Sequence, residues 1–208
     1  MNNRFNEVFS SFDPLNKEFS PGSCIIDIFP NCFSFYPYNK HSDNSLKAHS
    51  QQLNNNAITS LLNQSYTLIV TDAGIKNNMA TSIAYIHVCD KPIIKMIHHM
   101  VNITSTEAGL FAIRCGINQA VNIPEISKIV IITDFVHTVK RIFNSSLLSF
   151  QIHLASISKE LRKFFLLSTN NSIAFWEYPS CYKWSLYKSV DRKTKQFYQT
   201  LLFSCKSS

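Results

Sequence analysis

The sequence predicts an α/β domain with a five-stranded mixed sheet flanked by helices. Two segments carry this prediction: Lys128–Asp134 holds four consecutive apolar β-branched residues before Thr-Asp, and Tyr66–Asp72 ends in the same pair. Strands that are apolar on both faces are central and covered on both sides. Between them, the strand-like pattern of residues 80–103 gives way to helical spacing after Thr104. This change from period two to period 3.6 predicts a mixed fold.

Length and composition bound the class of protein. The chain has 208 residues and 45% hydrophobic content, enough for one ample domain with a tail or for two small ones. No segment approaches the roughly 20 apolar residues that a membrane span needs. The N-terminus lacks the apolar core of a signal peptide. We therefore expect a soluble, intracellular protein of the cytoplasm or nucleus without a membrane partner.

The charge favours an anionic partner. A net charge of +7 and a pI near 9.1 favour polyanions such as nucleic acid over small acidic substrates. The six cysteines are irregularly spaced and form no C-x-x-C pair, which disfavours a zinc knuckle or a redox dithiol.

Residues 1–64 differ in composition from the rest of the chain. Four prolines interrupt residues 14–37, and Asn, Ser and Gln dominate residues 39–56. Such a segment predicts a partly ordered lead-in or linker, with one helix near Asn56–Leu62. We expect the folded domain to span residues 65–200, followed by a tail at 201–208.

The first half of the domain reads as an antiparallel meander. Gly74 and Asn77-Asn78 form one turn and residues 90–92 another, since Gly, Asn, Asp and Pro favour tight turns. The expected strands are Tyr66–Asp72, Ala80–Val88 and Ile93–Ile103.

The second half alternates helices and strands. Leu110, Ile113 and Ile117 recur at helical spacing, and Pro124 ends that helix. The elements expected next are the strand 128–134, helices at His137–Phe143 and within Gln151–Leu167, a strand at Ser172–Trp176 and a helix at Val190–Tyr198. This order is that of the ribonuclease H-like topology, in which the first and fourth strands are neighbours.

Four carboxylates fall at positions that can bring them together. Asp72 and Asp134 end neighbouring strands, Glu107 lies in the first turn of a helix, and Asp191 begins the last helix. Clustered acids repel one another unless cations lie between them. Two Mg²⁺ or Mn²⁺ ions, about 3.5–4 Å apart, would relieve this repulsion and support phosphodiester hydrolysis. Oxygen ligands favour these ions over zinc.

Each acid also has a structural interpretation. Asp72 and Asp134 can open turns. Glu107 forms a T-x-x-E capping box with Thr104, and Asp191 can complement a helix dipole. These alternatives stay open at the level of sequence.

Three motifs resemble those of a known family. Thr71–Asn78, Thr104–Ile113 and Ile132–Phe135 resemble the three acid motifs of type 1 ribonuclease H domains, most of all those attached to reverse transcriptases of retroelements. Phe175–Asp191 resembles a divergent end of such a domain in fungal retroelements.

This resemblance implies an activity and a set of ligands. The activity is endonucleolytic cleavage of the RNA strand of an RNA–DNA hybrid. The implied partners are the hybrid and, in a full-length element, an upstream reverse transcriptase domain. The residues implied as catalytic metal ligands are Asp72, Glu107, Asp134 and Asp191.

Two departures from the family pattern define the alternative. Phe135 stands where a serine usually follows the third acid, and the usual Gly-His loop before the final Asp is absent. The alternative is a catalytically inactive, ribonuclease H-like nucleic-acid-binding module, a retroelement remnant.

Polar residues near the first acid can contact substrate. Lys76, Asn77 and Asn78 follow Asp72, where the amides of a turn can meet a phosphate backbone. Basic residues at 159, 162 and 163 can follow backbone phosphates without reading sequence, or can simply form a solvated helix face.

Overall fold

A computed structural model describes residues 25–36, 44–136, 139, 151–178 and 184–204. A six-stranded sheet lies at its centre, in the order β1-β6-β5-β2-β3-β4. The strands are β1 (Phe33–Tyr36), β2 (Thr67–Lys76), β3 (Met79–His87), β4 (Ile94–Val101), β5 (Lys128–Thr133) and β6 (Ser172–Glu177). The helices are α2 (Ile25–Ile28), the 3-10 turn η1 (Pro30–Cys32), α3 (Asn44–Asn63), α4 (Ser105–Ala120), α6 (Gln151–Leu167) and α7 (Ser185–Ser204).

The pairing of the strands confirms the predicted fold class. Strands β2, β3 and β4 form an antiparallel meander, and β5 and β6 continue the sheet in parallel with β2. The β2–β3 hairpin turns at Asn77 and Asn78, whose φ angles of 52° and 61° suit the tight turns of hairpins. Because the first predicted strand pairs with the fourth, this is the mixed, ribonuclease H-like sheet that the sequence predicts.

The sixth strand lies in the region predicted to be a lead-in. Strand β1 pairs in parallel with β6 at the edge of the sheet. Its aromatic side chains hold it there: Phe35 stacks on Phe175 with centroids 5.3 Å apart, and Phe33 meets Phe165 edge-on at 5.2 Å. The prolines that flank this strand do not prevent it, since a short edge strand fits between them.

Helix α3 also belongs to the packed structure. It covers residues 44–63, so it is longer than the predicted helix near Asn56–Leu62. Ile58 is fully buried, and the Tyr178 hydroxyl donates a 2.7 Å hydrogen bond to Asn55 Oδ1. The described residues before position 65 therefore pack on the sheet, and the proposed division of the chain at 64 stays a prediction.

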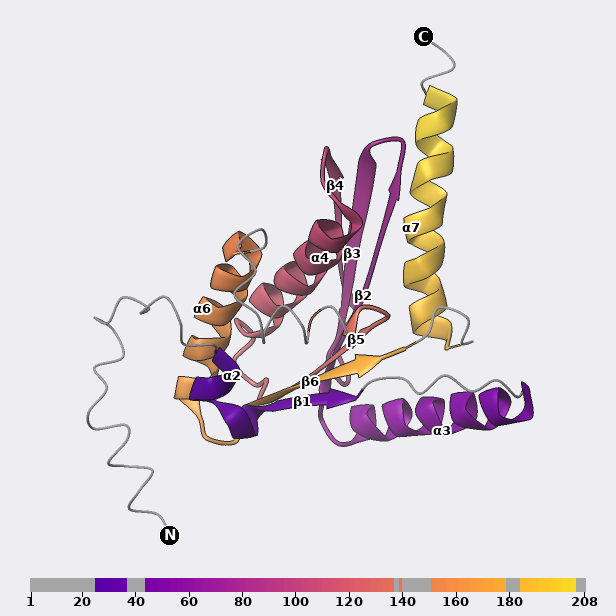
Figure 1. Ribbon diagram of the computed structural model, residues 1–208. Helices are drawn as coiled ribbons and strands as arrows, with labels where there is room; N and C mark the ends of the chain where they lie inside the picture. Colours follow the sequence, from indigo (N-terminus) through magenta and orange to yellow (C-terminus); the bar gives the residue numbers. More distant parts are fainter. Residues whose placement is uncertain (1–24, 37–43, 137–138, 140–150, 179–183, 205–208) are drawn as a thin grey trace.

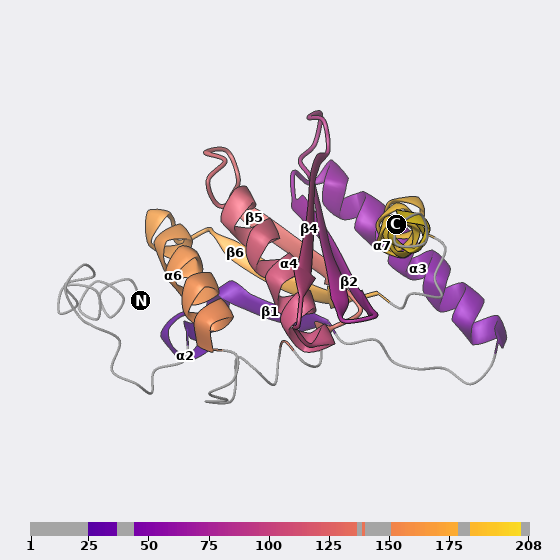
Figure 2. The ribbon, with the colours of Figure 1, turned by 90° about the horizontal axis from the view of Figure 1, so that it is seen from above.

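The sheet separates two hydrophobic layers. Alternation along β2 and β5 sends Ile69 and Ile131 to one face, and Val70 and Ile132 to the other. Helices α4 and α6 cover the first face, while α3 and α7 cover the second (Figure 2). Helix α7 runs beside the β2–β3 hairpin (Figure 1). Side chains near the end of β2 can therefore face either α4 or α7.

The remaining helices agree with the sequence to different degrees. Helix α6 has the predicted bounds, whereas α7 extends the predicted Val190–Tyr198 in both directions. The predicted helix at His137–Phe143 lies largely outside the described residues.

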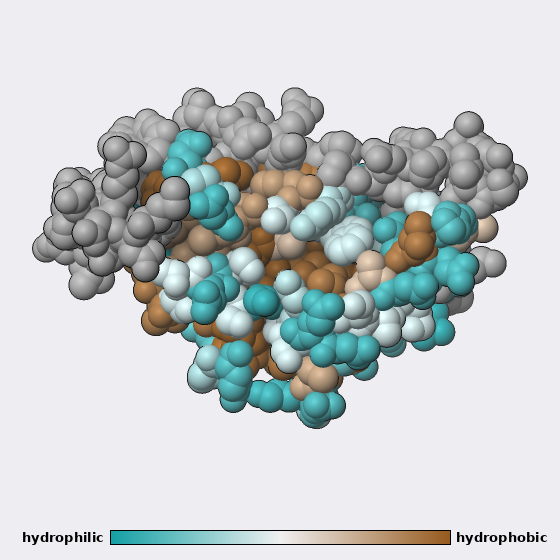
Figure 3. Space-filling model, turned by 90° about the horizontal axis from the view of Figure 1, so that it is seen from below, coloured by the Kyte–Doolittle hydropathy of each residue, from teal (hydrophilic) through white to brown (hydrophobic). Residues whose placement is uncertain are grey.

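The surface carries scattered apolar side chains. Seen from below, brown hydrophobic residues lie between teal hydrophilic ones (Figure 3). Tyr36 and Leu53 are about half exposed, at 49% and 55%. Within the described residues, no helix has the length and apolar character to cross a membrane.

Candidate active site

An open pocket lies beside the first turns of α4, where β5 ends and its pairing with β2 stops, while β2 itself continues to Lys76. Its volume is about 230 Å³. The residues that line it are Thr71, Asp72, Ala73, Ser105, Gly109, Thr133, Asp134 and Phe135. Asp72 and Asp134 share this pocket because β2 and β5 run in parallel, with Val70 opposite Ile132 two residues before each acid. Two of the four predicted carboxylates thus lie in one pocket.

Asp72 is a half-buried carboxylate whose ionisation is disfavoured. Strand alternation places it on the face of Val70, toward α7. Burial raises its pKa from 3.8 to about 6, and the charges of Asp134 and Asp191 add to this rise. The Thr194 hydroxyl of α7 and a backbone N–H act in the opposite direction without cancelling it. A cation beside Asp72 would restore its charged form.

Asp134 follows β5 directly and remains exposed on one side. Desolvation by the surrounding protein still raises the pKa of its carboxyl, and the charges of Glu177 and Asp191 raise it further. Desolvation and repulsion from neighbouring acids therefore raise the pKa of both Asp72 and Asp134.

Two further carboxylates, which do not line the pocket, raise the pKa of its acids. Asp191, on α7, raises the pKa of both pocket acids, and its own carboxylate lies 2.7 Å from the Lys195 ammonium. Glu177 ends β6 opposite Thr133, one residue before Asp134. The sequence interpretation overlooked Glu177, although the parallel pairing of two strands ending in Thr-Asp and Trp-Glu could have indicated it.

Glu107 lies apart from this group. Its Oε2 accepts hydrogen bonds from the Thr104 backbone N–H at 2.7 Å and from the Thr104 hydroxyl at 2.8 Å. Its own N–H donates to Thr104 Oγ1 at 3.2 Å, which completes the capping box. These bonds lower the pKa of Glu107. The structure thus confirms the capping interaction, and Glu107 is not among the residues that line the pocket.

The positions of α4 that do face the pocket are Ser105 and Gly109, one helical turn apart. A Cβ atom at position 109 would lie 3.4 Å from the Phe135 ring, an ordinary contact distance. Position 109 therefore has room for the start of a side chain at the wall of the pocket. A carboxylate from α4 would enter the pocket from this position, which is glycine in this chain.

Tyr187 of α7 lies near the pocket acids, on the second face of the sheet. The side chain is fully buried, and burial together with the charges of Asp134, Asp72 and Asp191 raises the pKa of its phenol. Although Asp134 is near enough to have this effect, the hydroxyl forms no hydrogen bond of acceptable geometry with any described residue. An unpaired buried hydroxyl is costly.

These residues fit one hydrated divalent cation better than two. Asp72 and Asp134 supply hard oxygen ligands, and the Tyr187 hydroxyl lacks a partner. No group of three or more His, Cys, Asp or Glu side chains is arranged to hold a metal ion in the described part of the chain. Of the predicted ligands, a second ion would need Asp191 or Glu107, whose carboxylates are bound to Lys195 and Thr104 respectively.

The predicted substrate contacts lie farther along the hairpin. Lys76, Asn77 and Asn78 are exposed at its tip. Lys76 is four residues beyond Asp72 on β2, which corresponds to roughly 13 Å along a strand. These residues therefore project from the same end of the sheet as the pocket, at a distance that suits contact with a neighbouring phosphate.

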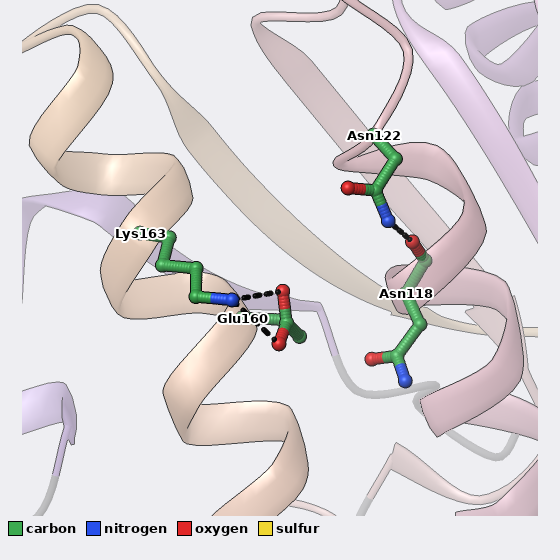
Figure 4. Close-up of polar contacts among 4 residues, drawn as sticks. All are labelled: Asn118, Asn122, Glu160 and Lys163. Carbon is green, nitrogen blue, oxygen red and sulfur yellow. Dashed lines mark hydrogen bonds and ion pairs between the residues drawn. The ribbon is translucent and has the colours of Figure 1, made fainter.

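The basic residues of α6 are partly engaged within their own helix. Lys163 forms an ion pair with Glu160 at 3.1 Å, facing the polar side of α4 that carries Asn118 and Asn122 (Figure 4). An exposed pair of this kind contributes little stability.

Comparisons with known proteins find similarity among solved structures. No protein-family model and no curated protein matches the chain. One similar solved structure is the N-terminal ribonuclease H domain of Rv2228c from Mycobacterium tuberculosis, fused to maltose-binding protein. The TM-score is 0.42 at 15% identity, over 55% of this chain and 87% of that chain. Our assignment of the fold rests on the strand order of the sheet itself.

Proposed function

We propose that this chain is a ribonuclease H domain of the retroelement kind that hydrolyses the RNA strand of RNA–DNA hybrids. The observation that carries the proposal is the convergence of Asp72 and Asp134 in one open pocket at the carboxyl end of β5, each acid two residues beyond the last pair of the parallel β2–β5 ladder. In open α/β sheets, this edge is where ligands bind.

The proposed chemistry assigns a role to each side of the pocket. Asp72 and Asp134 would hold Mg²⁺ or Mn²⁺, which supplies an activated water and stabilises the leaving oxygen of a phosphodiester. Because the pKa of Asp72 is about 6, its ligand form is fully present only above that pH unless a cation is bound. Lys76, Asn77 and Asn78 would contact the phosphate backbone beyond the cleavage site.

The two-ion mechanism makes a further demand on the chain. A second cation requires Asp191 to leave Lys195, or Glu107 to leave Thr104. The first exchange is the easier of the two, because the Lys195 side chain is 71% exposed and such ion pairs are weak. We therefore propose Asp191 as the additional ligand before Glu107.

A second candidate function has a specific observation in its favour. The pocket position on α4 is Gly109, and Glu107 is held in its capping box. With two carboxylates and no third acid from α4, the pocket would bind a cation weakly. This favours a catalytically inactive module that binds nucleic acid, a remnant of a retroelement.

Cleavage of a labelled RNA–DNA hybrid separates the two candidates. The assay contains Mg²⁺ or Mn²⁺ and compares the wild type with Asp134→Asn and Gly109→Glu. Glu125→Gln is a control, because Glu125 is an exposed acid paired with Lys91 and lies outside the pocket.

Three outcomes are distinguishable. Cleavage by the wild type and the control, lost in Asp134→Asn, supports the enzyme. Cleavage by Gly109→Glu alone supports the inactive module and identifies position 109 as the defect. No cleavage by any folded variant, together with hybrid binding by all of them, contradicts the hydrolytic proposal.

A further inference from the structure

The Tyr187 hydroxyl is an unexplained polar group beside the acid pocket. Its side chain is fully buried, and within the described residues its oxygen has no hydrogen bond of good geometry, although Asp134 lies close enough for the two groups to shift each other's pKa. The charges of Asp134, Asp72 and Asp191 all disfavour ionisation of its phenol, so the hydroxyl lies near these acids. A buried hydroxyl without a well-formed hydrogen bond indicates a missing partner, such as a water molecule between Tyr187 and the acids.

The ring is held by its neighbours, so the hydroxyl oxygen cannot move to another partner. Tyr187 packs in the hydrophobic layer under α7 with Val190. Its ring also meets that of Tyr178, with centroids 5.3 Å apart. Because the neighbouring side chains hold the ring, the phenol presents a donor at a constant place relative to the pocket.

We propose that Tyr187 is a positioning residue whose hydroxyl hydrogen-bonds to a water of a hydrated divalent cation held by Asp72 and Asp134. This inference rests on the cation site of the proposed function but not on hydrolysis. Mg²⁺ and related ions retain several waters when one or two carboxylates bind them. A bridging water satisfies the hydroxyl that lacks a protein partner and ties α7 to the sheet edge.

The neighbouring tyrosine provides a matched control. The Tyr178 hydroxyl donates to Asn55 Oδ1 at 2.7 Å, so Tyr178→Phe breaks a bond present in the protein without cation. Tyr187→Phe breaks none that the structure shows. The two substitutions remove the same atom from two rings in contact, and the hydroxyl of Tyr178 alone has a well-formed hydrogen bond to a described residue.

The experiment measures the melting temperature and the Mn²⁺ affinity of the full chain and both variants. Without cation, we expect Tyr187→Phe to melt at or above the wild-type temperature and Tyr178→Phe to melt below it. For Mn²⁺, followed by electron paramagnetic resonance, we expect Tyr187→Phe to bind roughly fivefold more weakly, as for one lost hydrogen bond. Tyr178→Phe should bind Mn²⁺ as the wild type does.

Two results would overturn the inference. A lowered melting temperature of Tyr187→Phe without cation would mean that the hydroxyl already has a protein partner. An unchanged Mn²⁺ affinity in that variant would mean that the hydroxyl does not meet the ion's water. Failure of the cation site itself is distinguished by the wild type, which would then bind no Mn²⁺.

Discussion

Two glycines of α4 lie on the same face of the helix, seven residues and about two turns apart, in opposite surroundings. A Cβ atom at Gly116 would lie 2.4 Å from Cγ2 of Ile69, a separation that packed atoms do not tolerate. A Cβ atom at Gly109 would lie 3.4 Å from the Phe135 ring and would border the pocket.

The difference shows how the fold produces its pocket. Helix α4 approaches β2 most closely at Gly116, where the absence of a side chain permits contact with Ile69 and Ala84. At Gly109 the helix borders open space at the sheet edge instead. One glycine is therefore required by packing, whereas the other leaves unfilled a position from which a side chain could enter the site.

The largest expected effect is at Gly116. Gly116→Leu should lower the free energy of unfolding by at least about 3 kcal/mol, the upper end of the usual cost of overpacking, because Ile69 would have to move. Urea unfolding measures this change. A loss below 1 kcal/mol would show that α4 can shift away from the sheet, which would remove the contrast with Gly109.

Asp72 should destabilise the protein when no cation is present. Its folded-state pKa of about 6 exceeds the unfolded value near 3.8, so the folded protein holds more protons between these pH values. Stability should fall as pH rises from about 4 to 6 and then level off. Asp72→Asn should remove this decline and gain at most about 3 kcal/mol at pH 7.5, from the 1.36 kcal/mol that each pKa unit represents.

Urea unfolding of wild type and Asp72→Asn across pH 4–8 tests that expectation, with Glu125→Gln as the exposed control. If the free energy of unfolding depends on pH in the same way in wild type and Asp72→Asn, the pKa of Asp72 is not raised by folding. Adding Mn²⁺ should narrow the gap between the two proteins, because the cation stabilises the ionised form of Asp72.

Gly109→Ala should stabilise the protein, in contrast to any substitution at Gly116. Alanine in a helix interior is favoured over glycine by about 1 kcal/mol, and the added carbon meets the Phe135 ring at an ordinary distance. Thermal unfolding detects a gain of this size. Destabilisation would mean that Phe135 fills the space more tightly than the structure shows.

The smallest effect concerns Glu107. Glu107→Ala should cost about 0.5–1 kcal/mol, the usual size of a capping interaction, because the bonds to Thr104 are lost. Mn²⁺ affinity should not change, since Glu107 lies outside the pocket lining. A tenfold loss of Mn²⁺ affinity in this variant would instead establish Glu107 as the ligand that the family resemblance implies.

The sheet was predictable because its signals are local. The apolar runs before the two Thr-Asp pairs, and the Asn77-Asn78 turn, identify strands and hairpin by pattern alone, although β2 continues four residues beyond its predicted end at Asp72. Strand β1 was missed because its stability comes from aromatic contacts with distant residues such as Phe165 and Phe175. No periodicity within four residues reveals such contacts.

The sequence predicts the site residues that the strands carry, but not those that the helices carry. Parallel strand ends predict that Asp72 and Asp134 meet. By contrast, the rotation of α4 decides whether position 107 or 109 faces the pocket, and that rotation is set by the packing of Gly116 on Ile69. Likewise, only the packing of α7 reveals that Tyr187 lies near Asp72 and Asp134.

The central claim is that Asp72 and Asp134 together hold a divalent cation. The most direct test is a Mn²⁺ titration at pH 7.5, followed by electron paramagnetic resonance, of wild type, Asp72→Asn, Asp134→Asn and the Glu125→Gln control. We expect one bound ion in the wild type and the control, and loss of that ion in each pocket variant. Equal binding by all four proteins, or no binding by the wild type, would contradict it.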